Sequence, residues 1–168
     1  MTNLQKDFSD IYDKYVRRIY RFVFLKINSQ EIAEDLTSEV FLRGWKAFQK
    51  SREGGEEIKN LPAFLYQIAR NVIVDFCRQN GNLKVVSAEH NEIIDSSPSL
   101  EEKAAVDSEM EEIRLVLSDI KDNYREVVTL RYIDDLSTAE IAEVLGKSEG
   151  SVRVTLHRAL AAMRKKLA

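Results

Sequence analysis

The sequence predicts an all-α protein made of two small helical domains that are joined by an acidic linker. Apolar residues recur at steps of three and four along most of the chain, which is the spacing of amphipathic helices. The 168 residues include only six glycines and two prolines, too few for strands joined by tight turns. An Asn-, Gly- and Ser-containing stretch ends at Pro98, so we place a linker at residues 81–107, between domains at 1–80 and 108–168.

The first domain is expected to hold three helices. The first covers residues 5–27, where apolar side chains follow the helical period. Asn28 and Glu31 have the spacing of a capping box, so a second helix is expected to begin there and to run to about Phe48. Its apolar positions also follow the helical period.

A surface loop and a third helix complete this domain. Residues 50–60 mix two glycines with charges and break the apolar pattern, which is typical of a loop. Pro62 is tolerated in a first helical turn, where its missing N–H costs no hydrogen bond. We therefore expect the third helix at residues 61–79.

The second domain is expected to begin with two short helices, around residues 108–120 and 124–134. Asn123 and Glu126 again have capping-box spacing, and this predicts the start of the second of them. The apolar side chains of both segments would pack against the helices that follow.

A helix-turn-helix motif ends the chain. Ser137 and Glu140 form a predicted capping box before a short apolar helix. Gly146 suits the left-handed residue that ends such a helix, and Ser148 can cap a longer helix that runs to about Lys166. A short helix, a glycine turn and a longer helix together predict a DNA-binding helix-turn-helix.

The longer helix has two different sides. Its apolar residues fall on one side at 100° per residue, and small, hydrogen-bonding and cationic residues fall on the other. That second side suits a major groove, although a solvated helix with a basic end gives the same pattern. The candidate DNA contacts are Ser148, Ser151, Arg153, Val154, His157, Arg158 and Lys165.

Charge is distributed unevenly along the chain, whose formal net charge is −3. Residues 82–110 carry seven acidic and two basic side chains, whereas residues 149–168 carry one acidic and five basic side chains. The basic end fits DNA. The overall acidity indicates partners other than DNA alone.

Composition excludes several other classes of protein. Cys77 is the single cysteine, so no internal disulfide can form, and a reducing, cytoplasmic location is expected. The N-terminus does not resemble a signal peptide, and no apolar run is long enough to span a bilayer. The sequence offers no metal-ligand set, phosphate loop or nucleophile–base pair, so we expect no metal, no cofactor, no catalytic residue and no enzymatic activity.

Two separate motifs resemble one known family. The stretch from Tyr124 to Arg153, with Leu136-Ser137, Glu140-Ile141-Ala142 and Leu145-Gly146, resembles region 4 of sigma-70 initiation factors, although two-component regulators share a similar helix-turn-helix. Residues 33–45 (AEDLTSEVFLRGW) resemble region 2.2, and residues 64–71 (FLYQIARN) resemble regions 2.3 to 2.4. Their order and the short length are similar to extracytoplasmic-function (ECF, group 4) sigma factors.

The resemblance implies partners and site residues. It implies that core RNA polymerase binds through its beta-prime clamp and beta flap, that region 4 reads the minus-35 element with the candidate contacts above, and that an anti-sigma factor regulates the protein. Clamp-binding residues would be Asp35, Leu36, Glu39, Leu42 and Arg43. Contacts to the minus-10 element would be Arg52, Lys59, Arg70 and Asn71.

The sequence also departs from the family pattern and leaves alternatives open. The 50–60 loop has no aromatic side chain on which to stack a flipped base. Val154 and Thr155 differ from the usual recognition-helix residues, so the promoter sequence cannot be transferred from relatives. A stand-alone helix-turn-helix regulator, which usually dimerises, is the main alternative, and a helical adaptor without a DNA role is a third.

Overall fold

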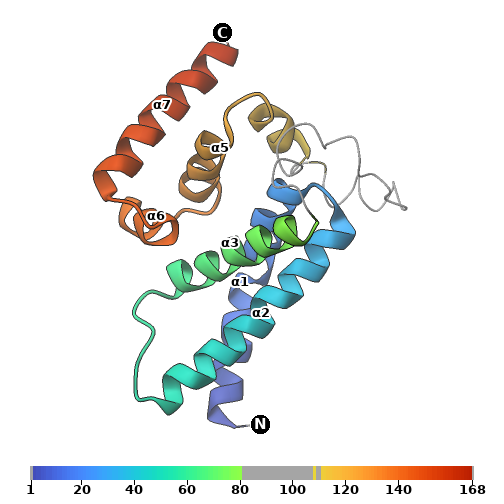
Figure 1. The fold of residues 1–168 in the computed structure, drawn as a ribbon, viewed down its shortest axis with the longest axis vertical. Helices are drawn as coiled ribbons and strands as arrows, with labels where there is room; N and C mark the ends of the chain where they lie inside the picture. Colours follow the sequence, from blue (N-terminus) through green and yellow to red (C-terminus); the bar gives the residue numbers. More distant parts are fainter. Residues whose placement is uncertain (1, 81–107, 109–110, 168) are drawn as a thin grey trace.

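The computed structural model describes residues 2–80, 108 and 111–167, and within these ranges it contains helices and no β-strand (Figure 1). The expected all-α class is therefore confirmed. The expected linker at 81–107 lies outside the described residues.

Three helices form the N-terminal domain: α1 (Asn3–Ile27), α2 (Gln30–Glu53) and α3 (Leu61–Gln79). Each begins at a side-chain cap, which satisfies backbone N–H groups that have no partner within the helix. At α3, the Asn60 side chain accepts a hydrogen bond from the Ala63 N–H at 3.0 Å, and Pro62 lies in the first turn as expected.

The junction between α1 and α2 differs from the prediction. Asn28 adopts a left-handed conformation, with φ 58°, and ends α1, whereas Ser29 accepts a hydrogen bond from the Ile32 N–H and caps α2. Asn28 was therefore wrongly expected to cap the second helix. Asparagine tolerates left-handed geometry better than most residues, and it takes the C-terminal position here.

The core of the N-terminal domain is aromatic. Phe22 and Tyr66 are almost fully buried, and their rings pack edge to face with centroids 5.3 Å apart. Phe8 packs against Trp45 and Phe48, with centroids 5.3 Å and 5.4 Å from its own. Trp45 is half-buried against this core, and the thiol-bearing Cys77 is buried, as expected of a small apolar residue.

The C-terminal domain starts with a helical segment at residues 111–117. Next come α5 (Asp122–Val128), the π-helical turn η3 (Thr129–Ile133), α6 (Thr138–Leu145) and α7 (Glu149–Leu167). The predicted cap by Asn123 and Glu126 is wrong: the cap position is Lys121, and it makes no side-chain cap hydrogen bond. Glu126 makes no capping hydrogen bond and is buried, where it pairs with Lys26 and Arg70 of the other domain.

The helix-turn-helix motif forms as predicted. Ser137 and Glu140 make both hydrogen bonds of a capping box, at 2.8 Å and 3.1 Å. Gly146 ends α6 with φ 67°, and the Ser148 hydroxyl accepts the Ser151 N–H at 3.1 Å at the start of α7. These local hydrogen bonds fix the turn between α6 and α7.

The two domains pack against each other in this structure. Helix α3 lies between the helices of the N-terminal domain and the C-terminal helices, and it contacts α6 (Figure 1). Helix α7 lies on the outer side of the C-terminal domain, where it packs on α5 and α6. In the part of the chain that the structure describes, no helix has the length and apolar character needed to cross a membrane.

Candidate functional site

Helix α7 presents all of its candidate DNA contacts to solvent. Its opposite side is buried through Val152, Leu156 and Ala159, which orients the helix. The exposed residues are Ser148, Ser151, Arg153, Val154, His157, Arg158 and Lys165. This arrangement is the split expected of a recognition helix.

The chemistry of this surface suits base edges and phosphates. The exposed guanidinium groups of Arg153 and Arg158 can donate to guanine or phosphate, and Val154, 49 % exposed, can contact a thymine methyl group. Arg153 lies 3.8 Å from Glu149 in an exposed ion pair, which contributes little to stability and leaves the arginine available.

The expected polymerase-binding residues lie together on one side of α2. Asp35 and Leu42 are exposed, with Leu42 49 % exposed, and Leu36 packs partly into the core. Exposed leucine and carboxylate side chains on one side of a helix combine an apolar anchor with polar groups, as helix interfaces do. The structure thus places this set on a surface that a partner can reach.

Arg43 is held by two carboxylates from two helices. Its guanidinium donates to Asp75 on α3 at 2.8 Å and to Glu39 one turn earlier at 3.0 Å. These hydrogen bonds, that of Asp75 first, raise the pKa of Arg43. Asp75 was missed by sequence reasoning because it is 32 residues from Arg43 in the chain, and no local pattern links the two.

The expected minus-10 residues do not form one cluster. Arg52 belongs to the last turn of α2, which extends past the predicted loop start to Glu53. A basic last turn is favourable at a helix C-terminus. Arg52 pairs with Asp7 at 3.3 Å and its guanidinium lies 4.9 Å from the centroid of the Phe48 ring. Lys59 and Asn71 are exposed.

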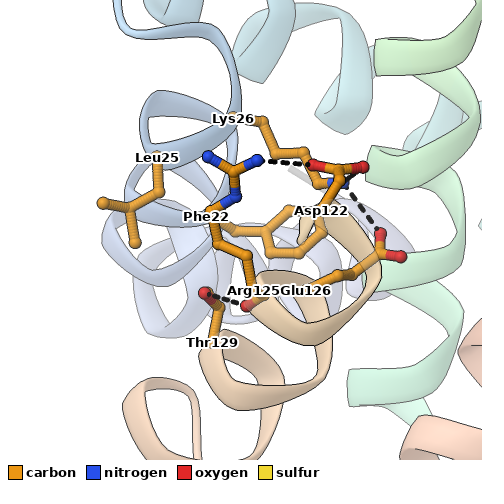
Figure 2. A pocket seen from close by; sticks show the side chains of 7 residues that line it. All are labelled: Phe22, Leu25, Lys26, Asp122, Arg125, Glu126 and Thr129. Carbon is orange, nitrogen blue, oxygen red and sulfur yellow. Dashed lines mark hydrogen bonds and ion pairs between the residues drawn. The ribbon is translucent and has the colours of Figure 1, made fainter. Parts of the chain in front are cut away.

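Arg70, by contrast, faces the C-terminal domain. Its Nε donates to Glu126 on α5 at 3.0 Å. Figure 2 shows the same carboxylate beside the Lys26 ammonium, which lies 3.2 Å away. Burial raises the pKa of Glu126, but the charges of Lys26 and Arg70 outweigh burial, and the pKa is lowered overall. Glu126 is therefore an ionised carboxylate enclosed by cations of the other domain.

A second carboxylate of the C-terminal domain enters the N-terminal domain. The Asp134 side chain is fully buried, and its Oδ1 accepts from Arg21 at 2.8 Å. Arg18 donates to the Asp134 backbone carbonyl at 2.6 Å. Burial raises the pKa of Asp134, while the hydrogen bond from Arg21 opposes that rise. Beside it, burial and then the Asp134 charge raise the pKa of the Tyr66 hydroxyl.

These interdomain carboxylates, Glu126 and Asp134, are functional candidates that the sequence did not indicate. Glu126 was assigned to a cap, and Asp134 was expected only as the last residue of the helix at 124–134. The available signal was the cationic side of α1, which includes Arg18 and Arg21. In the described part of the chain, no group of three or more His, Cys, Asp or Glu residues could hold a metal ion.

Comparisons with known proteins match both domains. Residues 11–82 match the family "Sigma-70 region 2", and residues 110–163 match "Sigma-70, region 4". The ECF RNA polymerase sigma factor SigW of Bacillus subtilis is 31 % identical over 97 % of this chain and 90 % of its own length.

Another relative and a solved structure differ in how much of their own length this chain covers. The ECF RNA polymerase sigma factor BldN of Streptomyces coelicolor is 33 % identical over 91 % of this chain. The chain spans 57 % of that relative's length. A solved structure of the sigma factor RpoE in complex with the anti-sigma factor NepR, from Bartonella quintana, has a TM-score of 0.70 at 20 % identity. It covers 96 % of this chain and 97 % of its own, so it shares the fold.

Proposed function

The chain belongs to the sigma-70 family as an ECF-type sigma factor, and on this premise we propose that it binds core RNA polymerase and directs it to specific promoters. The observation that carries the proposal is that one chain contains both sigma regions. Its region 2 match includes the exposed side of α2, and its region 4 match includes the exposed recognition helix. A stand-alone regulator needs the second feature only.

We propose that α7 reads the minus-35 element. Its exposed side enters the major groove, where Arg153 and Arg158 contact base edges or phosphates and Val154 contacts apolar base surface. Ser148 and Ser151, near the N-terminus of α7, position the helix on a phosphate. His157 and Lys165 extend the same side toward the backbone of the duplex.

The exposed side of α2 is proposed to bind the beta-prime clamp. Leu42 and Leu36 supply apolar contact, and Asp35 and Glu39 supply charge that selects the partner. Arg43 is positioned by Asp75, so its direction is set before binding. Region 4 would contact the beta flap, as the family resemblance implies.

The N-terminal domain is also proposed to bind the minus-10 element. Asn71 and Lys59 are exposed and available for the separated strand, and Arg52 extends from the end of α2. Arg70 joins them once it is released from Glu126. We propose the domain limits 1–80 and 108–168 with a linker at 81–107, since the family matches end and begin near these residues.

The proposal extends to location, regulation and chemistry. The chain would act in the cytoplasm, beside polymerase and chromosomal DNA, and would act by binding, without catalysing a reaction itself. An anti-sigma factor is proposed as a partner, because the structural relative from Bartonella quintana is described in complex with one. The complex of that relative supports an anti-sigma factor as the kind of partner, and it does not indicate which anti-sigma factor binds this chain.

The experiment that tests the proposal is run-off transcription. Purified core polymerase is supplied with a promoter library, with and without this protein, and transcript starts are sequenced. Starts that depend on the protein and share two spaced motifs are the expected result. If no such starts appear and core polymerase does not retain the protein in a pull-down, the initiation-factor role is wrong, and the stand-alone regulator takes its place.

A further inference from the structure

Helix α7 contains a glycine on its exposed side. Gly150 belongs to the first turn of this helix and is exposed. By helical period it lies on the same side as Val154 and His157, two of the candidate DNA contacts. A glycine within a helix lowers the stability of that helix relative to alanine, so this position carries a cost that alanine would not.

No contact within the described part of the chain accounts for the glycine. A Cβ added at Gly150 meets no atom within 4 Å, and the backbone there is not left-handed. The other glycines of the described residues differ, since one is buried, one ends α2 and two have positive φ; they are Gly44, Gly54, Gly55 and Gly146. Alanine would therefore fit at position 150 without clash or strain, and the fold does not require glycine there.

The side chains one turn further along α7 are directed toward this glycine. Helical side chains point back toward the helix N-terminus, and the ion pair of Arg153 with Glu149 at 3.8 Å follows that direction. Arg153 and Val154 are both exposed. A base edge or phosphate that contacts these two side chains therefore passes close to the backbone of Gly150.

The absence of a side chain at Gly150 suits a close approach of DNA to the helix backbone. Glycine is used where a backbone must come near a ligand, because no Cβ holds the two apart. A recognition helix contacts base edges with its N-terminal residues, and Gly150 is the second residue of α7. The missing side chain thus leaves space on the part of α7 that would lie nearest to the bases.

We propose that Gly150 is a close-contact point for promoter DNA, at which the backbone of α7 lies directly against the minus-35 element. The inference rests on the proposed function and adds a residue that sets how deeply the recognition helix enters the major groove. A side chain at position 150 holds the helix away from the DNA, so that Arg153 and Val154 no longer reach the base edges. The glycine therefore lowers helix stability and improves DNA contact, a trade-off that is common at functional sites.

The test compares two substitutions of Gly150 with the corresponding changes at a control position. Gly150→Ala and Gly150→Leu add side chains of increasing size, and alanine and leucine are both strong helix formers. Ser9→Ala and Ser9→Leu are the matched controls, because Ser9 is exposed within α1 and is outside the proposed DNA-binding and polymerase-binding residues. Each full-length chain is assembled with core RNA polymerase on the promoters at which the unmodified chain starts transcription.

We expect thermal stability and promoter use to change in opposite directions. G150A should raise the midpoint of thermal unfolding, measured by circular dichroism, and should lower transcription several-fold, with a larger loss in G150L. The Ser9 variants should keep their transcription, and all four variants should still be retained by core polymerase in a pull-down.

The upstream promoter motif provides a readout that a general folding defect would not change. Replacing this motif with unrelated sequence should lower transcription by a smaller factor for G150A than for the unmodified chain, because G150A has already lost part of that contact. A stable G150A that transcribes as well as the unmodified chain overturns the proposal and leaves the sigma function in place.

A second arm uses the chain without polymerase. Duplex DNA with a randomised central segment is mixed with each chain, and bound duplexes are recovered by electrophoretic mobility shift and sequenced. If the unmodified chain neither starts transcription nor binds core polymerase, the proposed function fails, and this arm decides the contact. A motif that the unmodified chain enriches and G150A does not then supports the close contact. Equal enrichment by both chains, or no enrichment by either, overturns it.

Discussion

At the residue scale, the buried carboxylate of Glu126 makes stability depend on pH. Its pKa lies below the ordinary value in the folded state, so its stabilising contribution is present above the unfolded pKa and is lost as pH falls through the lowered folded value. We expect Glu126→Gln to lower the free energy of unfolding by about 1–3 kcal/mol at pH 7.

That difference should disappear as the solution becomes more acidic than the lowered pKa of Glu126. Urea denaturation of both proteins between pH 7 and pH 3 measures it. The pKa of Asp134 is raised, but Asp134 is present in both proteins. Its effect on the pH dependence of stability is therefore the same in both and cancels in the comparison. A difference that stays constant across this range contradicts the assignment of Glu126 as an ionised interdomain group.

A second residue-scale prediction concerns Asp75. This carboxylate positions Arg43, at 2.8 Å, and its own side chain is 42 % exposed. Replacing Asp75 with asparagine should weaken core polymerase binding by a few-fold, because Arg43 loses a charged partner that fixes its direction. The measurement is the dissociation constant for core polymerase, with Asp13→Asn on the exposed side of α1 as the control. Equal constants for the two variants would mean that Asp75 has no such role.

At the element scale, the turn of the helix-turn-helix depends on Gly146. Its φ is +67°, and a Cβ added there meets no atom within 4 Å, so the cost of a side chain is conformational and not steric crowding by neighbours. Gly146→Ala should destabilise the C-terminal domain by about 1 kcal/mol.

The control for this prediction lies four residues further along the chain. Gly150 is helical, and a Cβ there also meets open space, so Gly150→Ala should stabilise by about 0.5–1 kcal/mol. Thermal unfolding followed by circular dichroism separates the two signs. If both substitutions change the stability in the same direction, the left-handed geometry of Gly146 is not the cause of the change.

The elements were largely predictable because their signals are local. The capping box of Ser137 and Glu140, the glycine at position 146 and the proline at position 62 act within one turn of helix, and each appears as predicted. The predicted helix ends were wrong where two local capping signals competed. Asn28 and Ser29 are both good capping residues, and their spacing alone did not decide which helix end each one takes.

At the scale of the whole molecule, the candidate site could be predicted only in part. Residues that share one helix face, such as those of α7, follow from helical period. Pairs such as Arg21 with Asp134 or Arg70 with Glu126 join residues 113 and 56 positions apart. No periodic or capping signal reports such pairs, since they depend on how two finished domains pack.

The packing of the domains predicts that their unfolding is coupled. Trp45 is the single tryptophan and belongs to the N-terminal domain, and Leu130 is fully buried in the C-terminal domain. Leu130→Ala should destabilise the C-terminal domain by about 2–5 kcal/mol. Because the two domains pack against each other, this substitution should also lower the urea concentration at which Trp45 fluorescence reports half-unfolding.

In the E126Q/D134N background, the same Leu130→Ala substitution should leave the Trp45 midpoint almost unchanged, because the domains no longer hold each other. Comparing the two backgrounds forms a double-mutant cycle across the interface. An equal shift in both would show that coupling does not depend on the interdomain carboxylates.

The π-helical turn η3 has an evolutionary consequence. Its wider turn, in which the Asp134 N–H reaches the carbonyl of Thr129 five residues earlier, accommodates one residue more than an α-helix of the same rise. Loss of a single codon within residues 129–133 would restore an α-helix and rotate Asp134 by about 100° away from Arg21. The motif from Ser137 onward would keep its own caps and turn. A single in-frame deletion would therefore remove the ion pair between Arg21 and Asp134 and leave the helix-turn-helix itself intact.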